Sequence, residues 1–73
     1  MQNTIKVERA RFNMSQQDLS EKVKVSRQTI NAIELGKKVP SVELALKIAR
    51  VFNQTVEAIF QLNHSSKIKT AKK

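Results

Sequence analysis

Residues 14–36 read MSQQDLSEKVKVSRQTINAIELG, and this stretch decides the fold. Ser15 is a favourable N-cap and Asp18 follows it three residues later, so a helix of about eight residues is expected to begin here. Ser26 is a second N-cap, and Gly36 stands where a helix end often needs a positive φ angle. The apolar residues spaced to hold two crossed helices over a third are Leu19, Val23, Val25, Ile30 and Ile33. Two short helices separated by about three residues predict a helix-turn-helix.

One helix is expected before this pair. Val7, Ala10 and Met14 recur at helical spacing and predict a helix from about residue 4 to residue 12. Asn13 follows this helix, and asparagine tolerates a left-handed backbone better than most residues do.

Two helices are expected after the pair. Ser41 caps a helix over residues 42–52 that is apolar on nearly all sides, as a central helix is. Thr55 caps a short last helix over residues 56–60. One glycine and one proline in the whole chain argue against an all-β fold, which needs many turns. We therefore expect an all-α, five-helix domain over residues 1–63.

The net charge of the chain limits the kinds of molecule that it is expected to bind. The 73 residues hold 14 Lys and Arg against 6 Asp and Glu, a net charge of +8. Four of those lysines lie in residues 64–73, which hold no acid, so this segment is expected to be a basic, flexible tail. The other 63 residues carry 10 bases and 6 acids, or +4. A balance of this kind indicates nucleic acid, an anionic membrane surface or an acidic protein as partner.

Other features exclude several kinds of protein. The absence of cysteine excludes disulfides and thiolate metal sites, and a single histidine, His64, cannot build a zinc site, so no metal or cofactor is expected. No apolar run reaches the roughly 18 residues of a membrane span, and the first residues lack the apolar region of a signal peptide. We expect a cytoplasmic protein. A chain this short has a marginal core, which favours a homodimer.

The same residues carry a resemblance to a known family. On residues 14–36, on Pro40-Ser41 and on the apolar helix that follows, residues 5–60 resemble the Cro- and lambda-repressor-type DNA-binding domain of the Xre family. The resemblance covers about three quarters of the chain and is greatest to small stand-alone bacterial and phage members. It implies a five-helix domain, usually dimeric, that binds operator DNA and regulates transcription.

The helix after Ser26 is expected to read base edges. Its residues off the apolar stripe face outward, and the first residues of such a helix meet the major groove. Arg and Gln side chains make paired hydrogen bonds to guanine and adenine edges, Thr and Asn reach a base edge or a phosphate, and Ala touches a thymine methyl group. The expected base contacts are Arg27, Gln28, Thr29, Asn31 and Ala32.

Phosphate contacts are expected at the ends of the two helices. Backbone amides at a helix N-terminus attract phosphate, and the resemblance implies that Gln16 and the loop lysines touch the DNA backbone. The expected phosphate contacts are Ser15, Gln16, Ser26, Lys37 and Lys38. The resemblance also implies an ion pair between Arg9 and Glu34. No second acid, histidine or nucleophile accompanies Glu34, so no catalytic residue is expected and the chain is not expected to be an enzyme.

The turn departs from the family pattern at one position. Lys24 stands where glycine is usual. If Lys24 takes a positive φ angle, the strain costs on the order of 1 kcal/mol. A turn with another backbone path is the alternative.

Several residues keep two interpretations. The aromatic rings lie in apolar helical stripes, which favours core packing over base stacking; they are Phe12, Phe52 and Phe60. Leu44, Val51 and Leu62 are candidates for a dimer face, with core packing as the equal alternative. Residues 61–63 either pair as a short strand with residues near Ile5 or remain unpaired.

Taken together, these features predict a dimeric, sequence-specific regulator that binds double-stranded DNA, most simply a repressor on a near-palindromic operator. A protein of another class stays open: a DNA-binding antitoxin or interaction protein whose main role is to capture a protein partner through residues 61–73. A third interpretation is a basic protein that binds DNA without sequence preference, with steep salt dependence.

Overall fold

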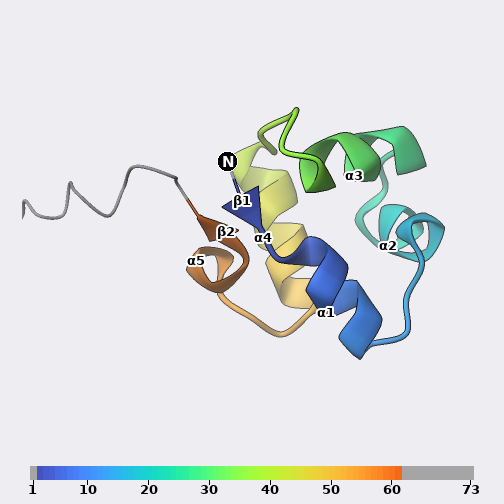
Figure 1. Ribbon diagram of the computed structural model, residues 1–73, viewed down its shortest axis with the longest axis horizontal. Coiled ribbons are helices and arrows are strands. Elements are labelled where there is room, and N and C mark those ends of the chain that lie inside the picture. The colour runs from blue at the N-terminus through green and yellow to red at the C-terminus, as the bar shows by residue number, and fades with distance from the viewer. Residues whose placement is uncertain (1, 62–73) are drawn as a thin grey trace, which may run out of the picture.

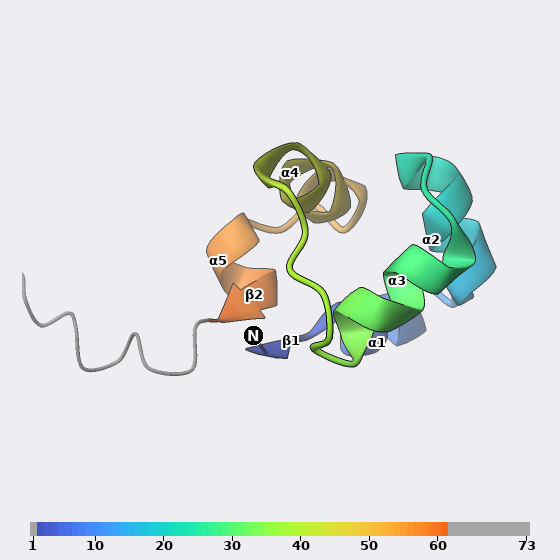
Figure 2. The same ribbon diagram turned by 90° about the horizontal axis from the view of Figure 1, so that it is seen from above.

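The computed structural model describes residues 2–61, which form five helices and one small strand pair. In chain order the elements are β1 (Gln2–Asn3), α1 (Ile5–Arg11), α2 (Gln16–Val23), α3 (Arg27–Glu34), α4 (Val42–Val51), α5 (Val56–Ile59) and β2 (Phe60–Gln61). The pair α2–α3 lies at one end of the molecule, and β1, β2 and α5 lie at the other (Figures 1 and 2). The predicted all-α fold is confirmed. No helix in the described part of the chain is long and apolar enough to cross a membrane.

Hydroxyl N-caps start four of the five helices where the sequence predicts them. Ser15, Ser26, Ser41 and Thr55 each accept a hydrogen bond from the backbone N–H three residues further on. These bonds satisfy amides that have no partner inside the helix, so the starts of α2 to α5 are fixed locally.

The cap of α2 is closed from both sides. Asp18 N–H donates to Ser15 Oγ over 2.9 Å, and Ser15 N–H donates to Asp18 Oδ2 over 3.0 Å. The hydrogen bond from the Ser15 backbone N–H, followed by that of the Ser15 hydroxyl group, lowers the pKa of the Asp18 carboxyl group below its usual value. The stabilisation is therefore present above the usual carboxyl pKa and is lost as pH falls through the lowered value.

One apolar core joins all five helices. It is built from aliphatic side chains and two phenylalanine rings, and α4 contributes more of its members than any other helix. The buried residues are Ile5, Leu19, Val23, Ile30, Ile33, Leu44, Ala45, Ile48, Ala49, Phe52, Ile59 and Phe60. The core lies beneath α3, so the outer side of α3 stays free.

Helix α1 is present where the apolar spacing predicts it, but the residues with that spacing do not mark its buried side. Val7 is 58% exposed and Ala10 is exposed as well, whereas Ile5 and Glu8, which are three residues apart, are buried. The inner side thus carries a carboxylate, 3.7 Å from the Arg11 guanidinium, where an apolar residue was expected. A search for apolar residues at helical spacing cannot identify a buried helix face that contains a charged residue.

Phe12 is a second correction to the predicted core. Phe52 and Phe60 are buried, but Phe12 is 49% exposed and covers the core from outside. Its ring stacks on Phe52 with 5.8 Å between the ring centroids. This separation lies within the range of favourable aromatic pairs, so Phe12 shields one side of Phe52 from water.

The last helix is shorter than predicted, because Phe60 belongs to a strand. Gln2 pairs with Gln61 and Asn3 with Phe60 in an antiparallel ribbon. Thr4 N–H continues the contact by donating to the Ile59 carbonyl over 2.9 Å. The open interpretation of a strand near this end is therefore correct in kind, and it begins one residue earlier than expected. Leu62 and Asn63, and the tail over residues 64–73, lie outside the described residues.

Lys24 adopts the left-handed conformation that a glycine would take without strain. Its φ and ψ angles are 63° and 46°, and Val25 N–H closes the turn by donating to the Ser20 carbonyl over 3.0 Å. Asn13 is also left-handed, with φ at 55°. Of the two interpretations of this turn, positive φ at Lys24 is the one observed.

We expect Lys24→Gly to raise the free energy of unfolding by about 1 kcal/mol, because glycine has no Cβ to clash in this conformation. Urea unfolding followed by circular dichroism measures the change. Lys22→Gly, inside the same helix, is the matched control and is expected to lower stability by about 1 kcal/mol. Equal losses in both variants would contradict the assignment of strain to Lys24.

Candidate nucleic-acid interface

The turn between α2 and α3 sets the angle between the two helices. It consists of Lys24, Val25 and Ser26. Val25 is half-buried against the core, and Ser26 caps α3. The Ser26 and Thr29 hydroxyl oxygens lie 3.0 Å apart, so they are hydrogen-bonded to each other as well. The start of α3 is thus held by the turn and by its own first residues.

The outer side of α3 is polar and open. Arg27, Gln28 and Asn31 are exposed, Thr29 and Ala32 are half-buried, and the inner positions of the helix lie in the core. The five residues predicted to contact bases therefore do not share one level of exposure. Arg27 and Gln28 are free along their length, whereas Asn31 accepts a hydrogen bond from Gln16 and Thr29 is engaged by the cap.

A buried ion pair attaches the last turn of α3 to α1. Arg9 Nε donates to Glu34 Oε2 over 2.6 Å, and Arg9 Nη2 donates to Glu34 Oε1 over 3.1 Å. The two side chains are only 14% and 8% exposed. Arg9 Nη1 also donates to the Met14 carbonyl over 2.9 Å, which links the same guanidinium to the chain just before α2. This paired geometry fixes both side chains in direction as well as in distance.

Gln16 connects the two helices of the motif. Its Nε2 donates to Asn31 Oδ1 and to Glu34 Oε1, over 3.1 Å in each case. The structure thereby brings together a residue predicted to touch phosphate and one predicted to touch a base. No pattern in the sequence predicts this contact, because the two residues are 15 positions apart.

The predicted phosphate contacts lie at the two ends of the motif. Ser15 and Gln16 stand at the start of α2. Lys37 and Lys38 are exposed in the loop after α3, which begins with Gly36 at φ 78°. Lys37 N–H donates back to the Ala32 carbonyl over 2.9 Å, so the loop leaves the helix along a fixed path.

Comparison with known proteins gives the family. The Helix-turn-helix family matches residues 5–59 of the chain. An uncharacterized HTH-type transcriptional regulator of Archaeoglobus fulgidus is 53% identical over 60 residues, covering 82% of this chain and 84% of its own. A regulator of the same description from Methanocaldococcus jannaschii is also 53% identical over 60 residues, covering 82% and 91%. The regulator YgzD of Bacillus subtilis is 48% identical over 66 residues, covering 90% and 100%.

The chain belongs to the helix-turn-helix family of transcriptional regulators. Members of this family form a DNA-binding class without enzymatic chemistry.

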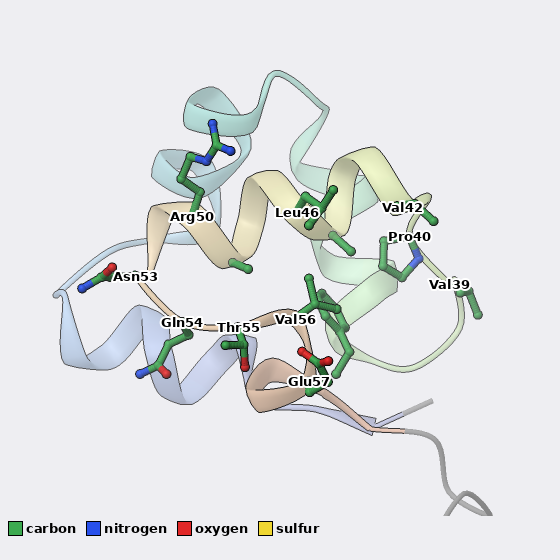
Figure 3. A pocket seen from close by; sticks show the side chains of 13 residues that line it. Val39, Pro40, Val42, Leu46, Arg50, Asn53, Gln54, Thr55, Val56 and Glu57 are labelled. Atoms are coloured by element: carbon green, nitrogen blue, oxygen red, sulfur yellow. The ribbon is translucent and has the colours of Figure 1, made fainter.

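This helix-turn-helix regulator also has an apolar groove away from α3. The groove has a volume of about 870 Å³ and lies between α4 and α5, with the loop before α4 at one end (Figure 3). Its apolar lining includes Val39, Pro40, Val42, Leu46 and Val56. Val42 and Leu46 are largely exposed, so α4 presents apolar surface to water.

This groove is relevant to the prediction of a dimer face. Leu44 is buried in the core and Val51 is half-buried against it, while Leu62 lies outside the described residues. The exposed apolar residues of α4 are Val42 and Leu46 instead. A helix that is apolar nearly all round signalled an outward apolar side, but not which residues form it.

We expect Arg9→Met to lower the free energy of unfolding by about 3 kcal/mol, because it leaves the Glu34 carboxylate buried without its cation. Urea unfolding measures the loss. Lys47→Met is the matched control, since Lys47 pairs with Glu43 over 3.5 Å on an exposed helix face, and it is expected to cost less than about 0.5 kcal/mol. A loss for Arg9→Met no larger than the control value would show that the buried pair does not hold α1 to α3.

Proposed function

We propose that this regulator is a homodimeric repressor that binds a near-palindromic operator with α3 of each subunit in the major groove. The observation that carries the proposal is the exposed side of α3, on which Arg27, Gln28 and Asn31 present polar groups to solvent while the helix is held at both ends. Guanidinium and amide groups in this position suit base edges. Thr29 and Ala32, half-buried on the same helix, are proposed as further base contacts.

Phosphate contacts are proposed to set the register of the domain on DNA. Ser15 and Gln16 offer a hydroxyl group and a backbone N–H at the start of α2, where the helix dipole favours an anion. Ser26 does the same at the start of α3, and Lys37 and Lys38 add charge beyond its end. These groups bracket α3, so they orient it without reading sequence.

The dimer is proposed to form across the apolar groove. Val42 and Leu46 expose apolar surface beside the loop that also carries Lys37 and Lys38. A second copy docked there would cover this surface and place the two copies of α3 on one side of the dimer. Two such helices fit successive major grooves roughly 34 Å apart. Bound across a promoter, the dimer would act by excluding polymerase.

Selection from a random duplex library at near-physiological salt is expected to enrich a two-fold-symmetric motif. Gln28→Ala should relax base preference at one position of each half-site, because Gln28 is proposed to contact a base edge. Lys38→Ala should weaken all sites alike and reduce the salt slope by about one unit.

Sequencing of the bound pools gives the preferences, and titrations at several salt concentrations give the slopes. Binding without any enriched motif would support the basic, non-specific alternative and overturn the proposed function. Identical behaviour of the two variants would overturn the division into base and phosphate contacts.

Leu46→Asp is expected to convert the dimer to a monomer and to weaken operator binding at least about tenfold, because it places a charge in an apolar interface. Analytical ultracentrifugation gives the oligomeric state. Val7→Asp is the matched control, since Val7 is exposed to a similar degree on α1. A dimer that survives Leu46→Asp would place the interface elsewhere.

A further inference from the structure

The side-chain amide of Gln16 has no hydrogen-bond donor left for DNA. Its nitrogen carries two N–H groups, and that nitrogen lies 3.1 Å from Asn31 Oδ1 and 3.1 Å from Glu34 Oε1. Both N–H groups are therefore used inside the protein. A phosphate only accepts hydrogen bonds, so any phosphate contact of Gln16 falls to its backbone N–H.

The direction of these hydrogen bonds is forced by the ion pair. The Glu34 carboxylate accepts from Arg9 through both oxygens and is only 8% exposed. An ionised carboxylate has no proton to donate, so Gln16 must turn its nitrogen, and not its oxygen, toward Glu34. The same nitrogen also faces Asn31. Asn31 must therefore turn its oxygen toward Gln16, because two N–H groups would repel each other.

Asn31 is thereby left with one kind of group for DNA. Its Oδ1 is occupied by Gln16, its Nδ2 keeps its N–H groups, and the residue is exposed on the outer side of α3. An unconstrained asparagine reads adenine by donating to N7 and accepting from N6. That oxygen keeps a second lone pair, but because it is held toward Gln16 it is poorly directed to make the second bond to adenine.

We propose that Arg9, Glu34 and Gln16 form a relay that fixes Asn31 as a hydrogen-bond donor, so that the operator carries a keto base, guanine or thymine, where Asn31 reads it. This inference rests on the proposed function. Guanine offers O6 and N7 as two acceptors and thymine offers O4, whereas adenine offers N7 beside an amino group that opposes the second Asn31 N–H, and cytosine offers an amino group alone. In this scheme Asn31 determines specificity and Gln16 is a positioning residue.

The test compares four chains in the same duplex-library selection: the wild type, Asn31→Ala, Gln16→Met and Gln17→Met. Asn31→Ala identifies the base that Asn31 reads, as the position at which preference disappears. Gln16→Met keeps the length of the side chain but removes its amide, which frees Asn31 to turn. Gln17→Met is the matched control, because Gln17 is exposed and donates only to Glu21 on its own helix.

The wild type is expected to favour guanine or thymine over adenine by roughly tenfold at that position. Gln16→Met should bring the ratio close to one by admitting adenine, while Gln17→Met should leave it unchanged. A wild-type preference for adenine or cytosine there would overturn the inference, as would an unchanged ratio in Gln16→Met or an Asn31→Ala variant that alters no position. These outcomes leave the proposed function standing, because each requires an enriched motif.

A measurement without DNA tests the relay separately. Nitrogen-15 relaxation of the Asn31 side-chain amide reports its mobility in the free protein. We expect its order parameter to fall in Gln16→Met and to stay unchanged in Gln17→Met. Equal order parameters in all three chains would overturn the relay. A wild type that enriches no motif overturns the proposed function and the keto preference with it, whatever the relaxation shows.

Discussion

The ion pair between Arg9 and Glu34 is the interaction on which the outer surface of α3 depends. It joins α1 to the last turn of α3, and the same guanidinium holds the Met14 carbonyl just before α2. One planar cation on α1 thus contacts both the last turn of α3 and the chain just before α2. A buried charge pair adds little net stability compared with apolar packing, but its geometry is directional. The contribution of the ion pair here is to orient α3. Its contacts at the last turn of the helix determine which side of α3 is exposed.

Most of the fold could be predicted from the sequence because its signals are local. A hydroxyl N-cap that accepts from the backbone amide three residues further on marks each of α2 to α5, and Gly36 follows the end of α3 with a positive φ angle. These features act within one helical turn. The helix-turn-helix, the length of its members and the exposed residues Arg27 and Gln28 follow from them.

The errors arise where the deciding contact is distant in sequence. Glu8 occupies the buried side of α1, so a search for apolar spacing selected Val7 and Ala10, which face water. Phe60 continues the helical pattern of α5 but is drawn into a strand by pairing with Asn3. The hydrogen bonds of Gln16 to α3 likewise depend on how two helices cross. Spacing along one helix carries no information about such a crossing.

The small ribbon has a consequence for the order in which the molecule assembles and opens. Gln2 and Gln61 are 59 positions apart, so pairing them closes nearly the whole described chain into one loop, at an entropic cost that the contacts between α2 and α3 do not carry. The ribbon is therefore the natural place for the domain to open first and to close last. Asn3 Nδ2 also donates to the Ile33 carbonyl over 2.8 Å, so the β1–β2 ribbon is hydrogen-bonded directly to α3. A force or partner that separates β1 from β2 would act on the last turn of α3 without touching DNA.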